Sequence, residues 1–440
     1  MTRKAREVVL AILIILAGIL VTEVKTGRIV LDWDGSGYVL GRGQEFVFEE
    51  TQEIAAPLPL ELQVLNAHGT VAVEGAETDK ITIHFTKRVY RKTMEEAREI
   101  ADRIKLLVNR SDPRLILSTN RDEFRRRPFE TDIKVTVPSG LAALIRNSYG
   151  LARAGGTGRT DILNRHGEVI ASALLGPLVL ENSYESVEID GVAGEARLNC
   201  PHADVVARNI QGDFIIDHSY GRLRIEDLSG RLTVNGSHSD VFAKNLGGDA
   251  EIRSSYEAVI VSRSRAVTIR GHHCEIDVQG TTGLCDITNE YGAVRVGDLR
   301  GNLKIDARKA EIIGRLIRAD DIAVATTYEK IYLTGFTGRT TVKISHAPLL
   351  LEPEAVTGPI DVQGSYADVT LLWPAGARHP FEAETRQGAI HWGLADRPAV
   401  ETSNGTSVTK AFLEETGRPA VKITTSYGDI RVESSPRRSF

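Results

Sequence analysis

An aromatic or imidazole ring returns at a nearly constant interval along the middle of this chain. Tyrosine alternates with histidine at these positions except at one lysine. The positions are Tyr149, His166, Tyr184, His202, Tyr220, His238, Tyr256, His273, Tyr291, Lys309, Tyr328, His346 and Tyr366. A fixed period of this kind is typical of a repeat architecture, in which each unit mainly contacts its neighbours.

Each repeat has the pattern strand, turn, strand, turn. After Tyr220, Leu223 and Ile225 alternate with polar residues, and after a turn at Gly230 a second apolar alternation begins. Period-two alternation indicates a strand with one buried face, and strands this short bury that face only by stacking on their neighbours. We therefore predict an all-β fold, a parallel β-solenoid (β-helix) of about thirteen 18-residue units over residues 141–375.

Two coil sizes fit the period. A coil of one repeat would stack tyrosine on histidine in one column, whereas a coil of two repeats would place the two residue types in separate columns. The strict alternation favours the longer coil, because two repeat types suggest two environments. The handedness of the coil does not follow from this pattern.

Composition narrows the class of protein. The 440 residues carry a formal net charge of −5 and are 42% hydrophobic, as in a globular chain, and no long basic stretch points to nucleic acid. The three cysteines, Cys200, Cys274 and Cys285, match neither a disulfide framework nor a metal-binding spacing. Burial as small residues is the preferred interpretation, and pairing of Cys274 with Cys285 stays open.

The amino terminus predicts attachment to a membrane. Arg3, Lys4 and Arg6 precede an uncharged run over residues 8–21, and no small-residue cleavage pattern follows. We predict a cytoplasmic tail (1–6), an uncleaved transmembrane helix (7–24) and a spacer (25–43), with a cleaved signal peptide as the alternative. The basic end would stay in the cytoplasm and leave the bulk of the chain extracytoplasmic at the cell membrane.

The segments flanking the repeats should close the two ends of the solenoid. Residues 44–140 predict a small α+β cap with one helix over 93–109, because Thr93 and Glu96 form a capping box. Residues 376–433 are predicted to form closing strands, and a Tyr427 repeat near their end should pair with the last coil. Residues 434–440 form a tail.

Three stretches carry a family resemblance. They are residues 62–73, the helix near Thr93, and the Tyr-Gly-x-Val or Tyr-Gly-x-Ile motif, as at Tyr291 and Tyr427. Over residues 44–433 the chain resembles bacterial β-strand-repeat proteins of unassigned function that carry the name adhesin and are related to the head domain of auto-transporter adhesins. The resemblance implies an amino-terminal membrane segment and no agreed activity.

The repeated rings are the candidate binding residues: Tyr184, Tyr220, Tyr256, Tyr291, His202, His238 and His273. A tyrosine face could pack on sugar, and a histidine row could bind metal or respond to pH. Structural stacking is the preferred interpretation of both. A linear histidine row does not converge on one point as metal ligands must, and tyrosine rings stacked in register leave only their edges free for a sugar. Asp204, Asp240 and Glu275 follow rings by two residues and could support such histidines.

These patterns predict a non-catalytic, adhesin-like binding or scaffold surface. A rigid solenoid offering repeated shallow contacts would gain affinity for a surface polysaccharide or protein by multivalency. No catalytic residue, metal or cofactor is predicted, because the sequence lacks the usual hydrolase, metalloprotease and nucleotide-binding motifs. The alternative is a carbohydrate-active β-helix enzyme, a polysaccharide lyase or hydrolase.

Overall fold

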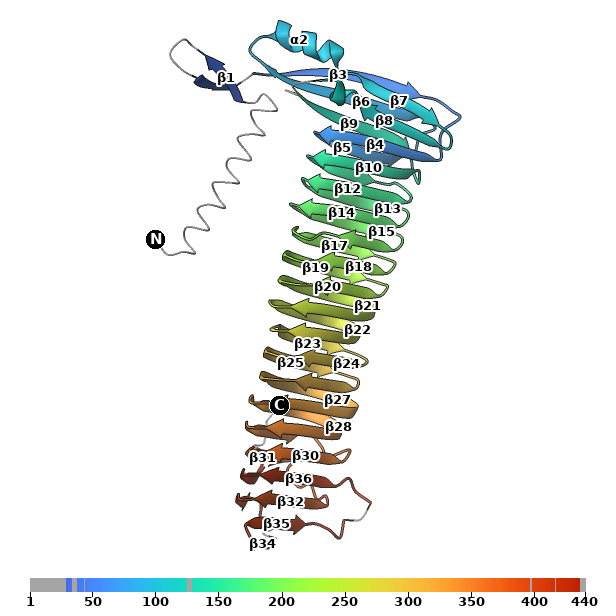
Figure 1. The fold of residues 1–440 in the computed structure, drawn as a ribbon. Helices are drawn as coiled ribbons and strands as arrows, with labels where there is room; N and C mark the ends of the chain where they lie inside the picture. The colour runs from blue at the N-terminus through green and yellow to red at the C-terminus, as the bar shows by residue number, and fades with distance from the viewer. Residues whose placement is uncertain are drawn as a thin grey trace. The chain divides into compact units, whose positions relative to one another are not determined.

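The computed structural model describes residues 29–33, 38–42, 44–124, 129–395, 398–415 and 417–435. The fold is all-β and is a parallel β-solenoid of about 13 turns in these residues, as the repeats predicted. It divides into two compact units, residues 1–199 (unit 1) and 200–440 (unit 2), and in each unit short strands stack in parallel (Figure 1).

Unit 1 begins with a hairpin in which β1 (Ile29–Trp33) pairs antiparallel with β2 (Tyr38–Arg42), where the sequence had predicted an irregular spacer. The further strands are β3 (Gln44–Ile54), β4 (Glu61–His68), β5 (Val71–Ala76), β6 (Ile81–Arg91), β7 (Leu106–Ser111), β8 (Arg114–Thr119), β9 (Phe129–Pro138), β10 (Ala142–Tyr149), β11 (Ala152–Gly155), β12 (Thr160–His166), β13 (Val169–Leu174), β14 (Leu178–Tyr184), β15 (Val187–Val192) and β16 (Ala196–Asn199).

Apart from the β1–β2 hairpin, these strands pair along two sheet faces, and the pairing becomes parallel where the coils begin. One sheet runs β3, β6, β9, β5, β11, β13, β15, and the other runs β7, β8, β4, β10, β12, β14, β16. The pairs β3–β6, β6–β9 and β7–β8 are antiparallel, and the others are parallel. The first coil is therefore formed by β4 and β5, within the segment that the sequence had assigned to the cap.

The helix α2 (Met94–Arg103) ends before the predicted end at 109. The Thr93 side chain accepts a hydrogen bond from the Glu96 amide, which confirms Thr93 as the N-cap residue of the helix. Ile104 already has an extended backbone, and Leu106 to Ser111 pair with β8. The helical spacing of Val108 was misleading because a strand can carry an apolar residue at the same interval.

The coil is one repeat long, and the longer coil favoured by the alternation is wrong. Tyr149 on β10 is the register partner of His166 on β12, and His166 is the partner of Tyr184 on β14. Tyrosine and histidine therefore stack on each other in one column. Two residue types need no separate environments, because both rings are planar and of similar width.

Unit 2 has the same coil design. Its strands are β17 (Val205–Ile210), β18 (Phe214–His218), β19 (Gly221–Leu228), β20 (Leu232–Gly236), β21 (Ser239–Ser255), β22 (Ala258–His272), β23 (Glu275–Thr281), β24 (Cys285–Asn289), β25 (Gly292–Leu299), β26 (Leu303–Ala307), β27 (Ala310–Thr327), β28 (Ile331–Ser345), β29 (Leu349–Pro353), β30 (Ile360–Ser365), β31 (Val369–Trp373), β32 (Phe381–Arg386), β33 (Ile390–Trp392), β34 (Val400–Ser403), β35 (Thr406–Ala411), β36 (Val421–Ser426) and β37 (Ile430–Ser434).

The core consists of columns of aliphatic side chains, one from each coil. In unit 1, Ile145, Ile162 and Leu180 are register partners and fully buried. In unit 2 the same arrangement recurs along β20 to β28, in the column Val234, Ile252, Ile269, Ile287, Ile305, Val324 and Val342. Each such side chain stabilises the fold by roughly 1.5–3 kcal/mol relative to exposure.

The carboxyl-terminal strands are not stacked in chain order. As predicted, the Tyr427 segment returns to the final coil, because β36 and β37 pair parallel with β30 and β31. The earlier strands β32 and β33 then pair on the outer side of β36 and β37, and the antiparallel strands β35 and β34 complete this end. The coil formed by β36 and β37 is thus inserted between two earlier ones.

Candidate functional site

The ring positions of unit 1 form one stacked column at a corner of the coils. His68, Tyr149, His166 and Tyr184 stack with ring centroids 4.6 to 4.8 Å apart and planes within 8° of parallel. His68 was missed by the sequence analysis, because most of the cap segment (44–140) lies between it and Tyr149 and breaks the period. The signal was present, since Asn66-Ala67-His68-Gly69 matches the Asn-x-ring-Gly pattern at Tyr149.

A longer column lies in unit 2 and contains the six other predicted binding residues. We call it the unit 2 ladder: His202, Tyr220, His238, Tyr256, His273 and Tyr291. Their centroids are 4.4 to 5.2 Å apart, and neighbouring planes lie 11° to 21° from parallel. Lys309 follows, with its ammonium 5.2 Å from the Tyr291 ring centroid, a cation–π contact.

A second run follows in unit 2. Tyr328, His346, Tyr366 and Tyr427 stack with centroids 4.7 to 5.0 Å apart. Tyr427 joins from the inserted coil, and its ring lies 6° from parallel with that of Tyr366. Two tyrosines therefore stack on neighbouring coils as well as a tyrosine and a histidine do.

The rings point to solvent because the backbone turns sharply at each corner. The ring residue itself has a left-handed backbone at several corners, for example φ 68° at Tyr256 and 63° at His273. At other corners the following glycine takes that conformation, as Gly292 does after Tyr291 (φ 99°). The stacked tyrosines stay 41% to 58% exposed except Tyr291, which is half-buried. Stacking therefore covers the ring faces and leaves the polar edges in water.

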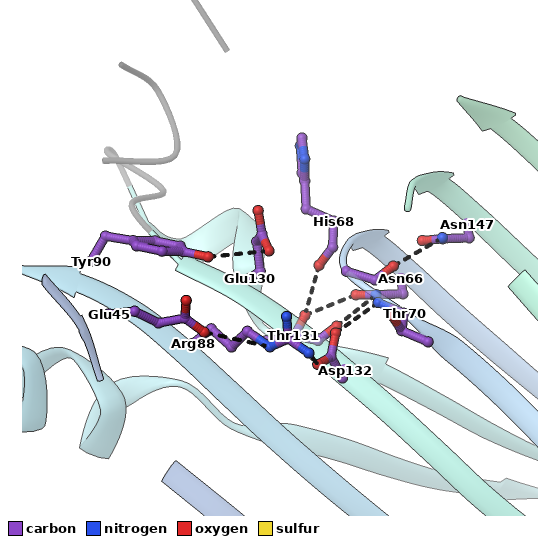
Figure 2. Close-up of polar contacts among 11 residues, drawn as sticks. Glu45, Asn66, His68, Thr70, Arg88, Tyr90, Glu130, Thr131, Asp132 and Asn147 are labelled. Carbon is purple, nitrogen blue, oxygen red and sulfur yellow. Dashed lines mark hydrogen bonds and ion pairs between the residues drawn. The ribbon is translucent and has the colours of Figure 1, made fainter. Parts of the chain in front are cut away.

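A buried amide supports the corner in several coils. In unit 1, Asn66 donates to the Thr131 carbonyl at 2.8 Å and accepts from the Thr131 hydroxyl at 2.9 Å, which links β4 to β9 (Figure 2). Figure 2 also shows the His68 imidazole pointing away from this polar network. In unit 2, Asn289 donates to the carbonyls of Cys274 and Tyr291. These amides satisfy corner carbonyls that face the interior.

His218 fills the same corner position, two residues before Tyr220. It is 2% exposed, with its Nε2–H donating to the Ala203 carbonyl at 2.7 Å and its Nδ1 2.8 Å from the Ser239 hydroxyl. Burial lowers the pKa of His218, although the Ala203 hydrogen bond and the Asp204 charge oppose that shift. This imidazole is a structural member of the corner and is not part of the ladder.

The carboxylates near the rings join one coil to the next. Asp204 accepts a hydrogen bond from the Arg222 amide at 2.9 Å, and Asp240 accepts one from the Ala258 amide at 3.2 Å. The Arg222 amide and guanidinium hold the pKa of Asp204 below its usual range. Glu275 forms an ion pair with Arg295 at 3.1 Å. These contacts stabilise the stacking of coils.

The histidine column does not form a metal centre in the part of the chain that the structure describes. No group of three or more His, Cys, Asp or Glu side chains there could hold a metal ion. At one corner the Nδ1 atoms of His272 and His273 lie 2.7 Å apart, and His272 Nε2 lies 2.9 Å from Glu290.

The three cysteines are buried and form no disulfide in the described residues, so Cys274 and Cys285 do not pair. Burial raises the pKa of Cys274, and it raises the pKa of Cys285 to about 12. Cys274 and Cys285 are therefore protonated at neutral pH and behave as small core residues, as predicted.

A groove lies on the outward face of β27 and β28. Its volume is about 700 Å³, and it is lined by Glu311, Ile313, Arg315, Leu316, Tyr332, Thr334 and Gly335. Glu311 is the one carboxylate in this lining, and it pairs with Lys330 at 3.1 Å. Glycoside hydrolysis ordinarily uses two carboxyl groups flanking the sugar bond.

Comparison with known proteins shows little sequence similarity. No family model matches the chain, and no curated protein matches it. A solved structure from Clostridium sporogenes, provisionally named a cell adhesion protein, has 7% identity and a TM-score of 0.15, with 88% of this chain and 100% of that chain covered. A second, from Bacteroides fragilis and provisionally named an adhesin, has 10% identity and a TM-score of 0.22, with 61% and 97% covered.

These comparisons do not support the predicted relation to the auto-transporter adhesin head domain. The predicted anchor at 7–24 lies outside the described residues. Within the described residues, no helix has the length and apolar character needed to span a bilayer.

Proposed function

We propose that this protein is a membrane-anchored, extracytoplasmic β-solenoid that serves as a non-catalytic, adhesin-like binding surface. One observation carries the proposal. In each unit, aromatic rings recur coil after coil at one corner, and stacking leaves their polar edges exposed. Packing of the hydrophobic core would not by itself require aromatic rings that stay about half exposed to water.

The repeated geometry supports binding by many weak contacts. Within each stacked run, every coil offers one phenol or imidazole edge about 4.8 Å from the next, the spacing of neighbouring strands. A ligand that touches several coils at once gains from effective concentration, so weak single contacts add. Catalysis, in contrast, needs unlike groups that converge on one reacting atom, and a row of like groups does not provide that.

A carbohydrate-active enzyme is the second candidate, and the groove on β27 and β28 favours it. The groove offers an aromatic ring, Tyr332, beside Glu311 and Arg315. Glu311 is engaged by Lys330, so a second acid or base would have to come from the ligand or from a rearrangement. This arrangement supports the enzyme less well than the ladders support a binding surface.

A substitution series separates the two candidates. Tyr220, Tyr256 and Tyr291 would be changed to alanine singly, in pairs and together, and Glu311→Gln would test the groove. Binding of the full chain to immobilised cell-surface polysaccharides and proteins would be measured beside the release of reducing sugar. A binding surface predicts a graded loss of binding with each ring removed. Normal binding by the triple variant, or sugar release abolished by Glu311→Gln, would contradict the proposal.

Anchoring is tested separately. The full chain should sediment with membranes and resist extraction by high salt, because an apolar helix is held by the bilayer core and not by surface charge. A variant lacking residues 1–24 should appear in the supernatant. Recovery of the full chain in the supernatant would contradict the anchored location without affecting the binding experiment.

A further inference from the structure

The unit 2 ladder has a chemical period twice as long as its structural period. Consecutive rings stand one coil apart, but tyrosine returns only every second coil, at Tyr220, Tyr256 and Tyr291. At about 4.8 Å per strand step, like groups are therefore about 9.6 Å apart. A ligand that contacts this edge meets a repeat of two coils.

The two ring types also differ in length, so the exposed edge of the ladder is uneven. A phenol carries its oxygen at the far end of a six-membered ring, whereas an imidazole ends in a shorter five-membered ring. Tyr220 and Tyr256 are both exposed, and their longer side chains leave a notch at His238 between two phenol hydroxyls. Both hydroxyl and imidazole can donate and accept hydrogen bonds.

A row of hydroxyl groups accompanies the rings. Ser219, Ser237 and Ser255 precede Tyr220, His238 and Tyr256 by one residue, and all three serines are half-buried. Their hydroxyls form no hydrogen bond to other residues that the structure describes. The corner thus presents two parallel rows of polar groups, one from ring edges and one from serines.

We propose, building on the binding surface proposed above, that the unit 2 ladder binds a linear β-1,4-linked glycan lying along the coil-stacking direction. In such a glycan each sugar is turned by about half a rotation relative to the last, so its repeat is a disaccharide about as long as two coils. The glycan hydroxyls can bond to successive phenols, while the notch at His238 receives the sugar between Tyr220 and Tyr256.

The charges around the ladder favour a neutral glycan. Arg222, the cation nearest to Tyr220 in sequence on this face, is paired with Asp204 at 3.1 Å. Lys309 at the end of the ladder lies over the Tyr291 ring. A polyanion would require repeated unpaired cations along the edge, and cello- and chito-oligosaccharides are therefore the probes of choice.

Chain length provides the decisive measurement. Binding of cello- and chito-oligosaccharides of two to six units to the full chain would be measured by calorimetry and by NMR titration. The inference predicts that affinity rises in steps with each added disaccharide. Tyr220→Phe and Tyr256→Phe keep the stack and remove one hydroxyl each, so each should weaken hexasaccharide binding about three- to ten-fold. Tyr332→Phe, a strand tyrosine off the ladder, is the matched control and should bind normally.

His238→Tyr tests the notch without breaking the stack. Tyr366 and Tyr427 show that tyrosines on neighbouring coils stack at 4.7 Å in this protein. The variant should fold normally, bind the glycan more weakly and lose the disaccharide step there, because tyrosine then stands on three successive coils from Tyr220 to Tyr256 and fills the notch.

Equal gains for each added sugar, no binding of either series, or full affinity in His238→Tyr would overturn the glycan inference. The proposed binding surface would survive that result if the triple alanine variant still lost binding to another surface ligand. It would fail together with the inference if that variant bound every ligand normally.

Discussion

Tyr328 and Tyr291 occupy equivalent ring positions with different backbones. Tyr328 has a φ of 66°, whereas at the Tyr291 corner the following Gly292 takes the left-handed conformation. A side chain in that region costs roughly 1–2 kcal/mol, and glycine avoids the cost. The two corners should therefore respond oppositely to glycine.

We expect Tyr328→Gly to be more stable than Tyr328→Ala by about 1 kcal/mol. At the other corner we expect Tyr291→Gly to be less stable than Tyr291→Ala by about 0.5–1 kcal/mol, because glycine gains nothing there and loses more conformational entropy. Urea unfolding of the four variants measures both differences, and the same sign at both corners would contradict this account.

His218 should make stability depend on pH. Because its pKa is lowered in the folded chain, the unfolded chain takes up a proton first as the pH falls below about 6.5. The free energy of unfolding should therefore decrease from about pH 6.5 downward through the folded pKa, and His218 should contribute no pH dependence above that range. The slope is measurable by denaturant unfolding on either side of neutral pH.

His218→Asn supplies the control, because asparagine fills this corner position at Asn289. The variant should show a shallower decline in stability at acidic pH, even if it is less stable at alkaline pH. Parallel curves for the two proteins would show that another group produces the pH dependence.

Among the elements, the corner amides hold adjacent strands together. Asn289 is 1% exposed, and its amide donates to Cys274 O at 2.8 Å and to Tyr291 O at 2.6 Å. Asn289→Ala leaves two interior carbonyls without a donor and should cost about 1–3 kcal/mol. Asn289→Asp should cost more at neutral pH, because it places a carboxylate against those carbonyls. Thermal unfolding would measure both, and equal stability of the two variants would contradict the assigned hydrogen bonds.

At some glycines, neighbouring turns approach each other too closely to leave room for a side chain. A Cβ added at Gly230 would lie 2.3 Å from the Gly212 carbonyl oxygen. Gly230→Ala should therefore force the two turns apart and destabilise the fold, whereas Ser229→Ala, beside it on the same turn, should have little effect. Chemical denaturation of both variants tests the contrast.

Much of this element structure was readable from the sequence, because strands with one buried face leave a strict alternation. The solenoid, the helix N-cap at Thr93 and the pairing of the Tyr427 segment with the last coil were all predicted. The coil length was misjudged because a sequence records which residues alternate and not which residues touch. His68 was missed because an insertion between two coils hides a period that the fold itself preserves.

At the scale of the whole molecule, the three cysteines form no disulfide in the described residues, so this part of the fold does not depend on an oxidising environment. The melting temperature should be the same with and without reductant. Thiol reagents at mildly alkaline pH should label Cys285 only after unfolding, since burial raises its pKa to about 12. Rapid labelling of the native protein would show that unit 2 opens locally.

The order of the carboxyl-terminal coils sets the order in which the chain can be completed. During synthesis, β32 and β33 leave the ribosome before β36 and β37, yet they join the coil of β30 and β31 only through those later strands. The segment containing β32 and β33 therefore stays separate from the coil of β30 and β31 until β36 and β37 have been synthesised. A product cut short before β36 by a premature stop codon would keep β30 and β31 as open edges, ready to pair with a neighbouring chain.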